Sequence, residues 1–262
     1  MWSVANVNTI KYECHHQVFW ITLSRVEKRN AFHPVLLDEL LQALQMAIDL
    51  SEVQAICLQA EGDFFSAGAD LDTMKNMAQA NWEDNVANAK QLADLLLAWH
   101  NCPKPTLCVV QGNAYGGALG LIAASDYVIA DEQAQLCFTE VRLGLIPAVI
   151  SPYILETIGM KATKKLFISA QNFSAQEALH YQLFDEIMPA YELEARSEII
   201  LSQWTQLPKE AVQIIKPWLF EIKDAPIDDR LSLKTAEKLA KTRTTPTAQQ
   251  LLKAFLNSKM KG

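Results

Sequence analysis

Long hydrophobic runs are absent from this 262-residue sequence. No uninterrupted apolar stretch approaches the ~20 residues that a membrane-spanning helix needs, so we expect no membrane association. The first residues, Met1 to Glu13, also lack a basic region followed by an apolar run, which is the pattern of a signal peptide. These absences favour a cytoplasmic protein.

Paired cysteines and an excess of positive charge are absent too. The odd number of cysteines, their wide spacing and the lack of any CxxC pattern indicate reduced, buried thiols and predict no metal site. The five are Cys14, Cys57, Cys102, Cys108 and Cys137. A formal charge of -7 and a pI near 5.3 argue against a general nucleic-acid-binding protein. They still allow an anionic ligand, because a local basic patch can hold one.

What is present is the composition of an ordinary globular protein, with 50% apolar and 20% charged residues. The first ~190 residues alternate strand-like and helix-like patterns, and the remainder is helical. We therefore predict an α/β core over residues 1–195 and a helical region over 196–262 that packs on its own or a neighbouring core. Ser174 and Glu177 have the spacing of a capping box and predict a short helix that ends at His180.

Two loops with small residues each follow a predicted buried strand. One runs from Gly112 to Gly117 and leads into a small-residue helix, and the other runs from Ala60 to Leu71. Glycines at a turn from strand to helix let the backbone approach a ligand closely and direct N–H groups at it. Both loops could therefore offer a backbone N–H to one ligand atom. Glu140, among apolar neighbours, is a candidate acid or base.

In this order and spacing, the motifs resemble those of the crotonase superfamily, also called the enoyl-CoA hydratase/isomerase family. The resemblance covers nearly the whole chain, and its details are similar to bacterial methylglutaconyl-CoA hydratases. The matching segments are Lys28 to Phe32, Phe65 to Leu71, Gly112 to Asp126, Thr139 to Pro147 and Phe173 to Ala178.

The resemblance implies a spiral of ββα turns, a C-terminal helical layer that forms a trimer or a dimer of trimers, and an acyl-CoA thioester as substrate. Coenzyme A is then part of the substrate, and no cofactor or metal is expected. The catalytic positions implied are Glu140 and the N–H groups of Ala69 and Gly117. The implied substrate-binding positions are Lys28, Arg29, Ala31, Ala67, Gly68, Asp70, Leu71, Gly116, Gly120 and, from a neighbour's C-terminal helix, Phe255 and Lys259.

One departure from the family pattern leaves the reaction open. Two-glutamate hydratases place their first carboxylate where this chain has Gly120, so only Glu140 remains. We favour a hydratase for a branched 2-enoyl-CoA such as 3-methylglutaconyl-CoA, in which Gly120 would leave room for the acyl group. The alternatives are a double-bond isomerase that uses Glu140 alone, another enolate chemistry, and a non-catalytic acyl-CoA-binding scaffold. Taken without the resemblance, Glu140 could equally be a surface carboxylate paired with Arg142.

Overall fold

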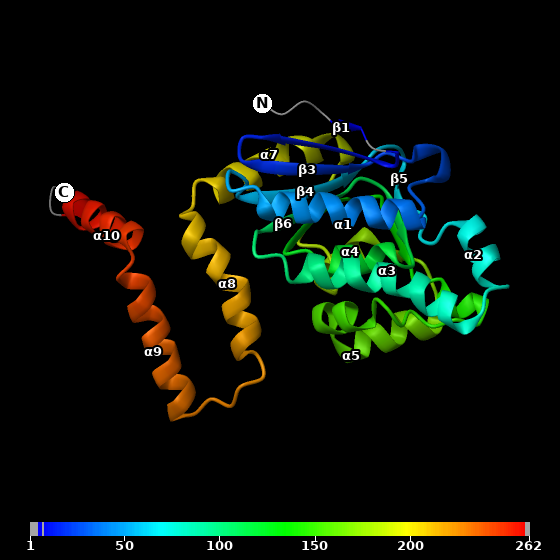
Figure 1. Cartoon of the computed structure of the whole chain (residues 1–262). Coiled ribbons are helices and arrows are strands. Elements are labelled where there is room, and N and C mark those ends of the chain that lie inside the picture. The colour runs from blue at the N-terminus through cyan, green and yellow to red at the C-terminus, as the bar shows by residue number, and fades with distance from the viewer. Residues whose placement is uncertain (1–4, 7, 260–262) are drawn as a thin grey trace. The chain divides into compact units, whose positions relative to one another are not determined.

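The computed structural model describes residues 5–6 and 8–259 (Figure 1). The chain divides into two compact units, Met1–Thr205 and Gln206–Gly262, and each is described by itself. The strands, all in the first unit, are β1 (Ala5–Asn6), β2 (Ile10–His15), β3 (Val18–Leu23), β4 (Ala55–Ala60), β5 (Phe64–Ser66), β6 (Thr106–Val110), β7 (Asn113–Tyr115), β8 (Tyr127–Asp131), β9 (Gln135–Cys137), β10 (Phe173–Ser174) and β11 (Glu186–Met188).

The first unit also contains seven α-helices and three short 3₁₀ helices among its described residues. They are α1 (Pro34–Asp49), α2 (Leu71–Met77), α3 (Trp82–His100), α4 (Ala118–Ala123), α5 (Ser151–Ser169), α6 (Ala175–His180), α7 (Leu193–Thr205), η1 (Val26–Lys28), η2 (Glu140–Leu143) and η3 (Ala190–Glu192).

The strands form two sheets that the chain visits in alternation. The larger sheet has the order β1-β2-β3-β4-β6-β8-β11, and the smaller has the order β10-β9-β7-β5. Successive pairs β4–β5, β6–β7 and β8–β9 each place their first strand in the larger sheet and their second in the smaller one, and a helix follows each pair. This is a spiral of ββα turns, so the expected α/β architecture with a helical C-terminal region is confirmed.

Alternating residues of the strands form two separate apolar layers. Phe19 and Ile21 of β3 belong to one cluster of buried side chains, whereas Val18 and Trp20 belong to another. Because successive side chains of a strand point to opposite faces, the larger sheet is covered on both sides. Helix α7 packs against β4, β6 and β8 on one face, and α1 and α3 pack together with the larger cluster (Figure 1).

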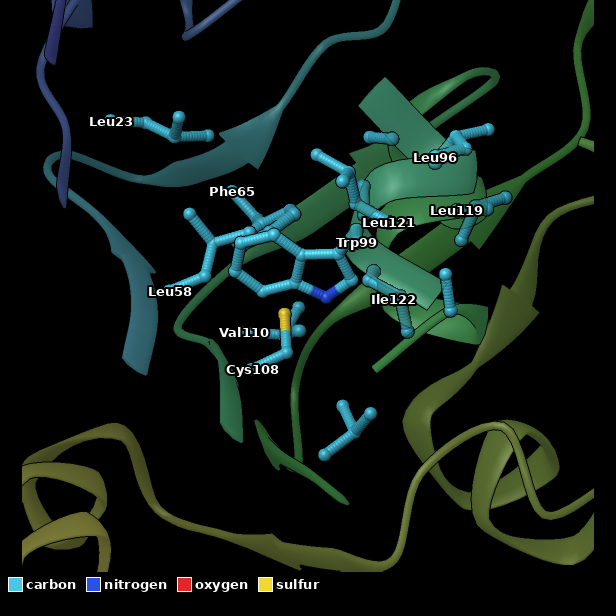
Figure 2. Close-up of a cluster of buried hydrophobic side chains, with 14 of the residues drawn as sticks. Leu23, Leu58, Phe65, Leu96, Trp99, Cys108, Val110, Leu119, Leu121 and Ile122 are labelled. Atoms are coloured by element: carbon cyan, nitrogen blue, oxygen red, sulfur yellow. The ribbon is translucent and has the colours of Figure 1, made fainter. Parts of the chain in front are cut away.

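The larger cluster joins the sheets to α3 and α4. Trp99 of α3, which is 1% exposed, lies among Leu58, Phe65 and Val110 from the strands and Ile122 from α4 (Figure 2). The indole N–H of Trp99 donates to Ser125 Oγ over 2.9 Å, so this buried polar group is satisfied. The packing holds α4 against the sheets and α3.

The second unit consists of helices α8 (Lys209–Ile222), α9 (Asp229–Arg243) and α10 (Pro246–Lys259). None of the residues described in these helices is buried. Ile215, Leu219, Leu239 and Phe255 are among the apolar side chains that remain exposed. Within the described ranges of the whole chain, no helix is both long and apolar enough to cross a membrane.

Candidate active site

The loop after β5 is held by a short ladder to the first loop of the chain. Phe32 and Ala69 form a parallel bridge, in which Phe32 N–H donates to Gly68 O over 2.6 Å and Asp70 N–H donates to Phe32 O over 2.9 Å. The N–H of Ala69 shares a trans peptide group with Gly68 C=O and therefore points away from Phe32. It donates to no other residue in the described part of the chain.

The loop after β7 presents a second N–H group. Gly116 N–H donates to Cys137 O over 3.0 Å, and Gly116 has a φ of 54°, where glycine is favoured. This turn leads through Gly117 into α4. The first N–H groups of a helix have no partner within it, and that of Gly117 finds no acceptor among the described residues either.

The two loops touch each other through positions that have no side chain. A Cβ atom on Gly68 would lie 2.8 Å from the carbonyl oxygen of Tyr115, which a real side chain would not tolerate. A Cβ atom on Gly117 would lie 3.7 Å from the ring of Phe32, the residue that pairs with Ala69. The structure therefore brings the loops of Ala69 and Gly117 together.

Glu140 stands beside this junction at the start of η2. A Cβ atom on Gly116 would lie 3.4 Å from Glu140 Oε1, so the absence of a side chain there keeps the carboxylate next to the loop. Glu140 Oε2 is buried and has no hydrogen-bond partner among the described residues. Burial raises the pKa of Glu140, and the N–H groups of Glu140 and Thr139 oppose this only in part.

The ion pair between Glu140 and Arg142 does not form. The guanidinium of Arg142 instead donates to the carbonyl oxygen of Ala170, at the end of α5. Cys137 Sγ also donates to that oxygen over 3.1 Å. Arg142 thus anchors the short helix that carries Glu140 and leaves the carboxylate available for chemistry.

Two outward N–H groups and a carboxylate with one unpartnered oxygen are suited to stabilise an oxyanion and to move a proton. Preorganised donors aimed at a developing negative charge are the main catalytic device for reactions that pass through an enolate or tetrahedral state. A buried carboxylate with a raised pKa can transfer protons near neutral pH. Within the described residues, no group of three His, Cys, Asp or Glu side chains could hold a metal ion.

Comparison with known proteins agrees with this geometry. The sequence pattern of the family described as "Enoyl-CoA hydratase/isomerase" matches residues 13–258. The chain belongs to the enoyl-CoA hydratase/isomerase family. A solved enoyl-CoA hydratase from Shewanella pealeana ATCC 700345 is 36% identical, with a TM-score of 0.92 over 96% of this chain and 94% of that one. The enoyl-CoA isomerase/hydratase fer4 of Mycosarcoma maydis is 33% identical over 185 residues, 66% of this chain and 65% of that protein.

A third similar structure comes from the Pseudomonas aeruginosa protein AtuE. It is 28% identical and has a TM-score of 0.90, covering 96% of this chain and 97% of its own. The two structural matches span almost the full length of the spiral and the C-terminal helices. Membership in the family therefore does not depend on the two glycine-containing loops alone.

The environment of Gly120 differs from our expectation. A Cβ atom at this position would lie 2.5 Å from Ile150 Cγ2 and 2.9 Å from Leu96 Cδ1, so apolar side chains already fill the space. Gly120 is itself buried within α4. The expected room for a bulkier acyl group next to Gly120 is therefore not present.

The predicted coenzyme A loop has its cations at the surface. Lys28 Nζ lies 3.3 Å from Asp72 Oδ2, and both side chains are well exposed. The guanidinium of Arg29 lies 4.9 Å from the centre of the Phe64 ring. Ala31 is buried and Ala67 partly buried, and Ala67 N–H donates to Arg29 O over 2.9 Å. The two loops expected to hold coenzyme A are therefore joined directly.

Asp70 and Leu71 have different roles from each other. Asp70 is 2% exposed, caps α2, and pairs with Arg25, so both of its oxygens are used within the protein. Its carboxylate therefore supports the loop, as a helix cap and ion-pair partner, and its place among the substrate-binding residues stays a prediction. Leu71 is 73% exposed and is free to contact an acyl-CoA.

Phe255 and Lys259 lie on α10 of the second unit, where both side chains are exposed. Their contribution to a neighbour's site stays a prediction.

Sequence reasoning missed the residues that support the site from behind. Arg25 lies in a polar run with several cations, a pattern that predicts a solvated surface, yet its side chain is 15% exposed and paired. Asn30 is fully buried, and its side-chain amide donates to Glu61 O and Phe64 O over 2.9 Å each. The buried positions of these residues could not be recognised within a run of charged residues, because spacing alone does not distinguish a buried cation from a solvated one.

Proposed function

We propose that this protein is an enoyl-CoA hydratase that adds water to a 2-enoyl-CoA thioester. The observation that carries the proposal is the meeting of two loops with outward N–H groups, at Ala69 and Gly117, beside the carboxylate of Glu140, whose Oε2 has no hydrogen-bond partner among the described residues. A protein that only bound acyl-CoA would not need a buried carboxylate at this point, because burying a charge without a partner is costly.

In the proposed mechanism, the N–H groups of Ala69 and Gly117 hold the thioester oxygen. Charge moves onto this oxygen as the enolate forms, and each preorganised donor lowers the barrier by about 3–4 kcal/mol where such donors have been removed in other enzymes. Glu140 then acts as the proton donor or base at the acyl chain. Burial raises the pKa of Glu140, which makes the carboxylate a better proton acceptor than a solvated glutamate.

For the acyl group, we propose a branched 2-enoyl-CoA such as 3-methylglutaconyl-CoA, which would place the protein in leucine degradation. The similarity of the segments around Gly117 and Pro147 to bacterial methylglutaconyl-CoA hydratases supports this choice. The filled space at Gly120 adds no support to it, since Ile150 and Leu96 occupy the position where a branch was expected to fit.

A double-bond isomerase is the second candidate, and the residue at position 120 favours it. Because Gly120 has no side chain, Glu140 is the one carboxylate at the two positions where two-glutamate hydratases have theirs. One carboxylate suffices to carry a proton from the α-carbon to the γ-carbon. The similarity to fer4, whose name includes both activities, is consistent with either candidate.

The deciding experiment follows the loss of conjugated thioester absorbance with 3-methylglutaconyl-CoA and crotonyl-CoA in separate reactions. Glu140→Gln keeps the size of the side chain and should slow turnover by about 10²–10⁴-fold. Loss of absorbance with the branched substrate alone supports the specialised hydratase, and equal turnover of both supports a broad one. If neither is consumed, the hydratase proposal fails, and a 3-enoyl-CoA that gains conjugation would establish the isomerase.

We also propose that the protein assembles as a trimer or a dimer of trimers. The helices of the second unit bury none of their described residues and expose apolar side chains such as Leu251, Leu252 and Phe255. Exposed apolar faces of this kind usually pack against another surface. Light scattering after size-exclusion chromatography tests the proposal, and a monomeric mass at micromolar concentration would contradict it.

A further inference from the structure

Arg25 makes two hydrogen bonds through a single nitrogen atom behind the Ala69 loop. Its Nη1 donates to Asp70 Oδ2 over 2.7 Å and to Ala31 O over 3.2 Å. The pair is well shielded, since the side chains of Arg25 and Asp70 are 15% and 2% exposed. Such a pair is stronger and more directional than one in water.

The bond to Ala31 begins a chain of peptide groups that ends at the proposed catalytic N–H. Ala31 C=O and Phe32 N–H belong to one peptide group, and Phe32 N–H donates to Gly68 O over 2.6 Å. Gly68 C=O in turn shares a peptide group with the N–H of Ala69. A positive charge thus stands at one end of two linked peptide groups, and the outward Ala69 N–H stands at the other.

The bond to Asp70 fixes the other side of Ala69. Asp70 N–H donates to Phe32 O over 2.9 Å, and Asp70 Oδ1 accepts from the N–H groups of Asp72 and Thr73. The main chain on both sides of Ala69 is therefore hydrogen-bonded to the same residue, Phe32. Arg25 is the residue that ties the two sides together.

We infer that Arg25 and Asp70 are positioning residues, through which the Arg25 charge orients and polarises the Ala69 N–H as an oxyanion donor. Hydrogen-bonded peptide groups polarise one another, with an estimated strengthening of about 10–30% per bond. The inference rests on the proposed function, because it needs a thioester oxygen at Ala69. It assigns Arg25 a part in catalysis although the side chain itself touches no substrate.

The first test is kinetic and uses the full chain with crotonyl-CoA and 3-methylglutaconyl-CoA. Arg25→Met keeps the apolar stem and removes the charge, and we expect kcat to fall about 10–100-fold, since displacing a catalytic group by about 1 Å can cost 10²-fold. KM should change less than about threefold, because the donor acts mainly on the developing charge. Arg25→Lys keeps a charged donor and should recover part of the loss.

The second test reads the polarisation of the bound carbonyl directly. Crotonyl-CoA is bound to Glu140→Gln, in which turnover is suppressed, and the red shift of its conjugated thioester absorbance is compared with that in Arg25→Met/Glu140→Gln. We expect the shift to be smaller in the double variant. If Arg25→Met does not fold, Asp70→Asn, which keeps an oxygen to cap α2, replaces it in both tests.

Arg196→Met is the matched control. Arg196 makes two hydrogen bonds to Glu186, of 2.7 and 2.6 Å, and it lies on α7 at the opposite face of the larger sheet. Its loss should lower the melting temperature without changing kcat or the shift. An unchanged kcat and an unchanged shift in Arg25→Met would overturn the inference while the proposed function stands. A wild-type protein that neither binds nor converts any enoyl-CoA would overturn both.

Discussion

The free energy of unfolding depends on whether Glu140 is charged. Burial raises the pKa of Glu140, so the folded chain holds this proton more tightly than the unfolded chain does. The stabilising contribution is complete below the unfolded-state pKa of about 4.3, and it is lost as the pH rises through the higher folded-state value. We therefore predict that Glu140→Gln is no more stable than the wild type in acid but becomes the more stable protein at neutral pH.

Urea unfolding of the wild type and Glu140→Gln from acid to neutral pH measures how the Glu140 charge changes the free energy of unfolding. Other titrating groups are common to the two chains, so they cancel in the difference between the two free energies of unfolding. A difference that stays constant with pH, or that changes in favour of the wild type as the pH rises, would contradict the assigned direction of the pKa shift.

Position 120 favours glycine because neighbouring side chains leave no space for a Cβ atom, and not because of its backbone conformation. The Cβ of Gly120→Ala would lie 2.5 Å from Ile150 Cγ2, and we predict a loss of about 1–3 kcal/mol in the free energy of unfolding through overpacking. The better helix propensity of alanine, worth about 1 kcal/mol, offsets part of that loss. Ile150→Ala removes the obstructing methyl group, so the double variant should be less destabilised than the sum of the single ones. Strict additivity in thermal or urea unfolding would show that the two residues do not compete for one space.

At the scale of elements, the short helix α6 shows how local signals determine a boundary. Ser174 accepts from Glu177 N–H, and Glu177 accepts from Ser174 N–H, which confirms the capping box predicted from the sequence. We predict that Ser174→Ala lowers the free energy of unfolding by about 0.5–2 kcal/mol. Gln176→Ala, an exposed change on the same helix, is the control and should stay within about 0.5 kcal/mol. Equal effects of both changes in urea unfolding would argue against the cap.

Elements and loops with local signals were predictable, and contacts between distant segments were not. The alternation of strands and helices, the end of α6 at His180 and the two small-residue loops all follow from neighbouring residues. Ile150, the residue before α5, packs against Gly120 of α4 thirty positions earlier, and no local sequence pattern indicates this contact. The pairing of Arg25 with Asp70 is equally long-range, so a buried role for Arg25 could not be separated from a solvated one.

At the scale of the whole molecule, burial is distributed unequally between the two units. The buried apolar clusters lie within the first unit, whereas α8, α9 and α10 bury none of their described residues. The spiral has its own core, and the C-terminal helices need a further surface to shield their apolar side chains. The resemblance to the family implied the two-sheet spiral, which composition and periodicity could not predict. The strands of the second sheet have only two or three residues each and are too short to show a pattern.

The buried thiols allow the unfolding of the first unit to be measured by chemical labelling. All five cysteines belong to this unit, each is buried, and none forms a disulfide. Burial raises the pKa of Cys57 and Cys108, which further lowers the fraction of reactive thiolate. We predict that the native protein reacts negligibly with an aromatic disulfide reagent and that all five thiols react once denaturant opens the first unit. Helix content is followed in parallel by circular dichroism, which reports on both units. Rapid labelling of any cysteine before helix content falls would contradict the prediction, because it would require a local opening of the core at native conditions.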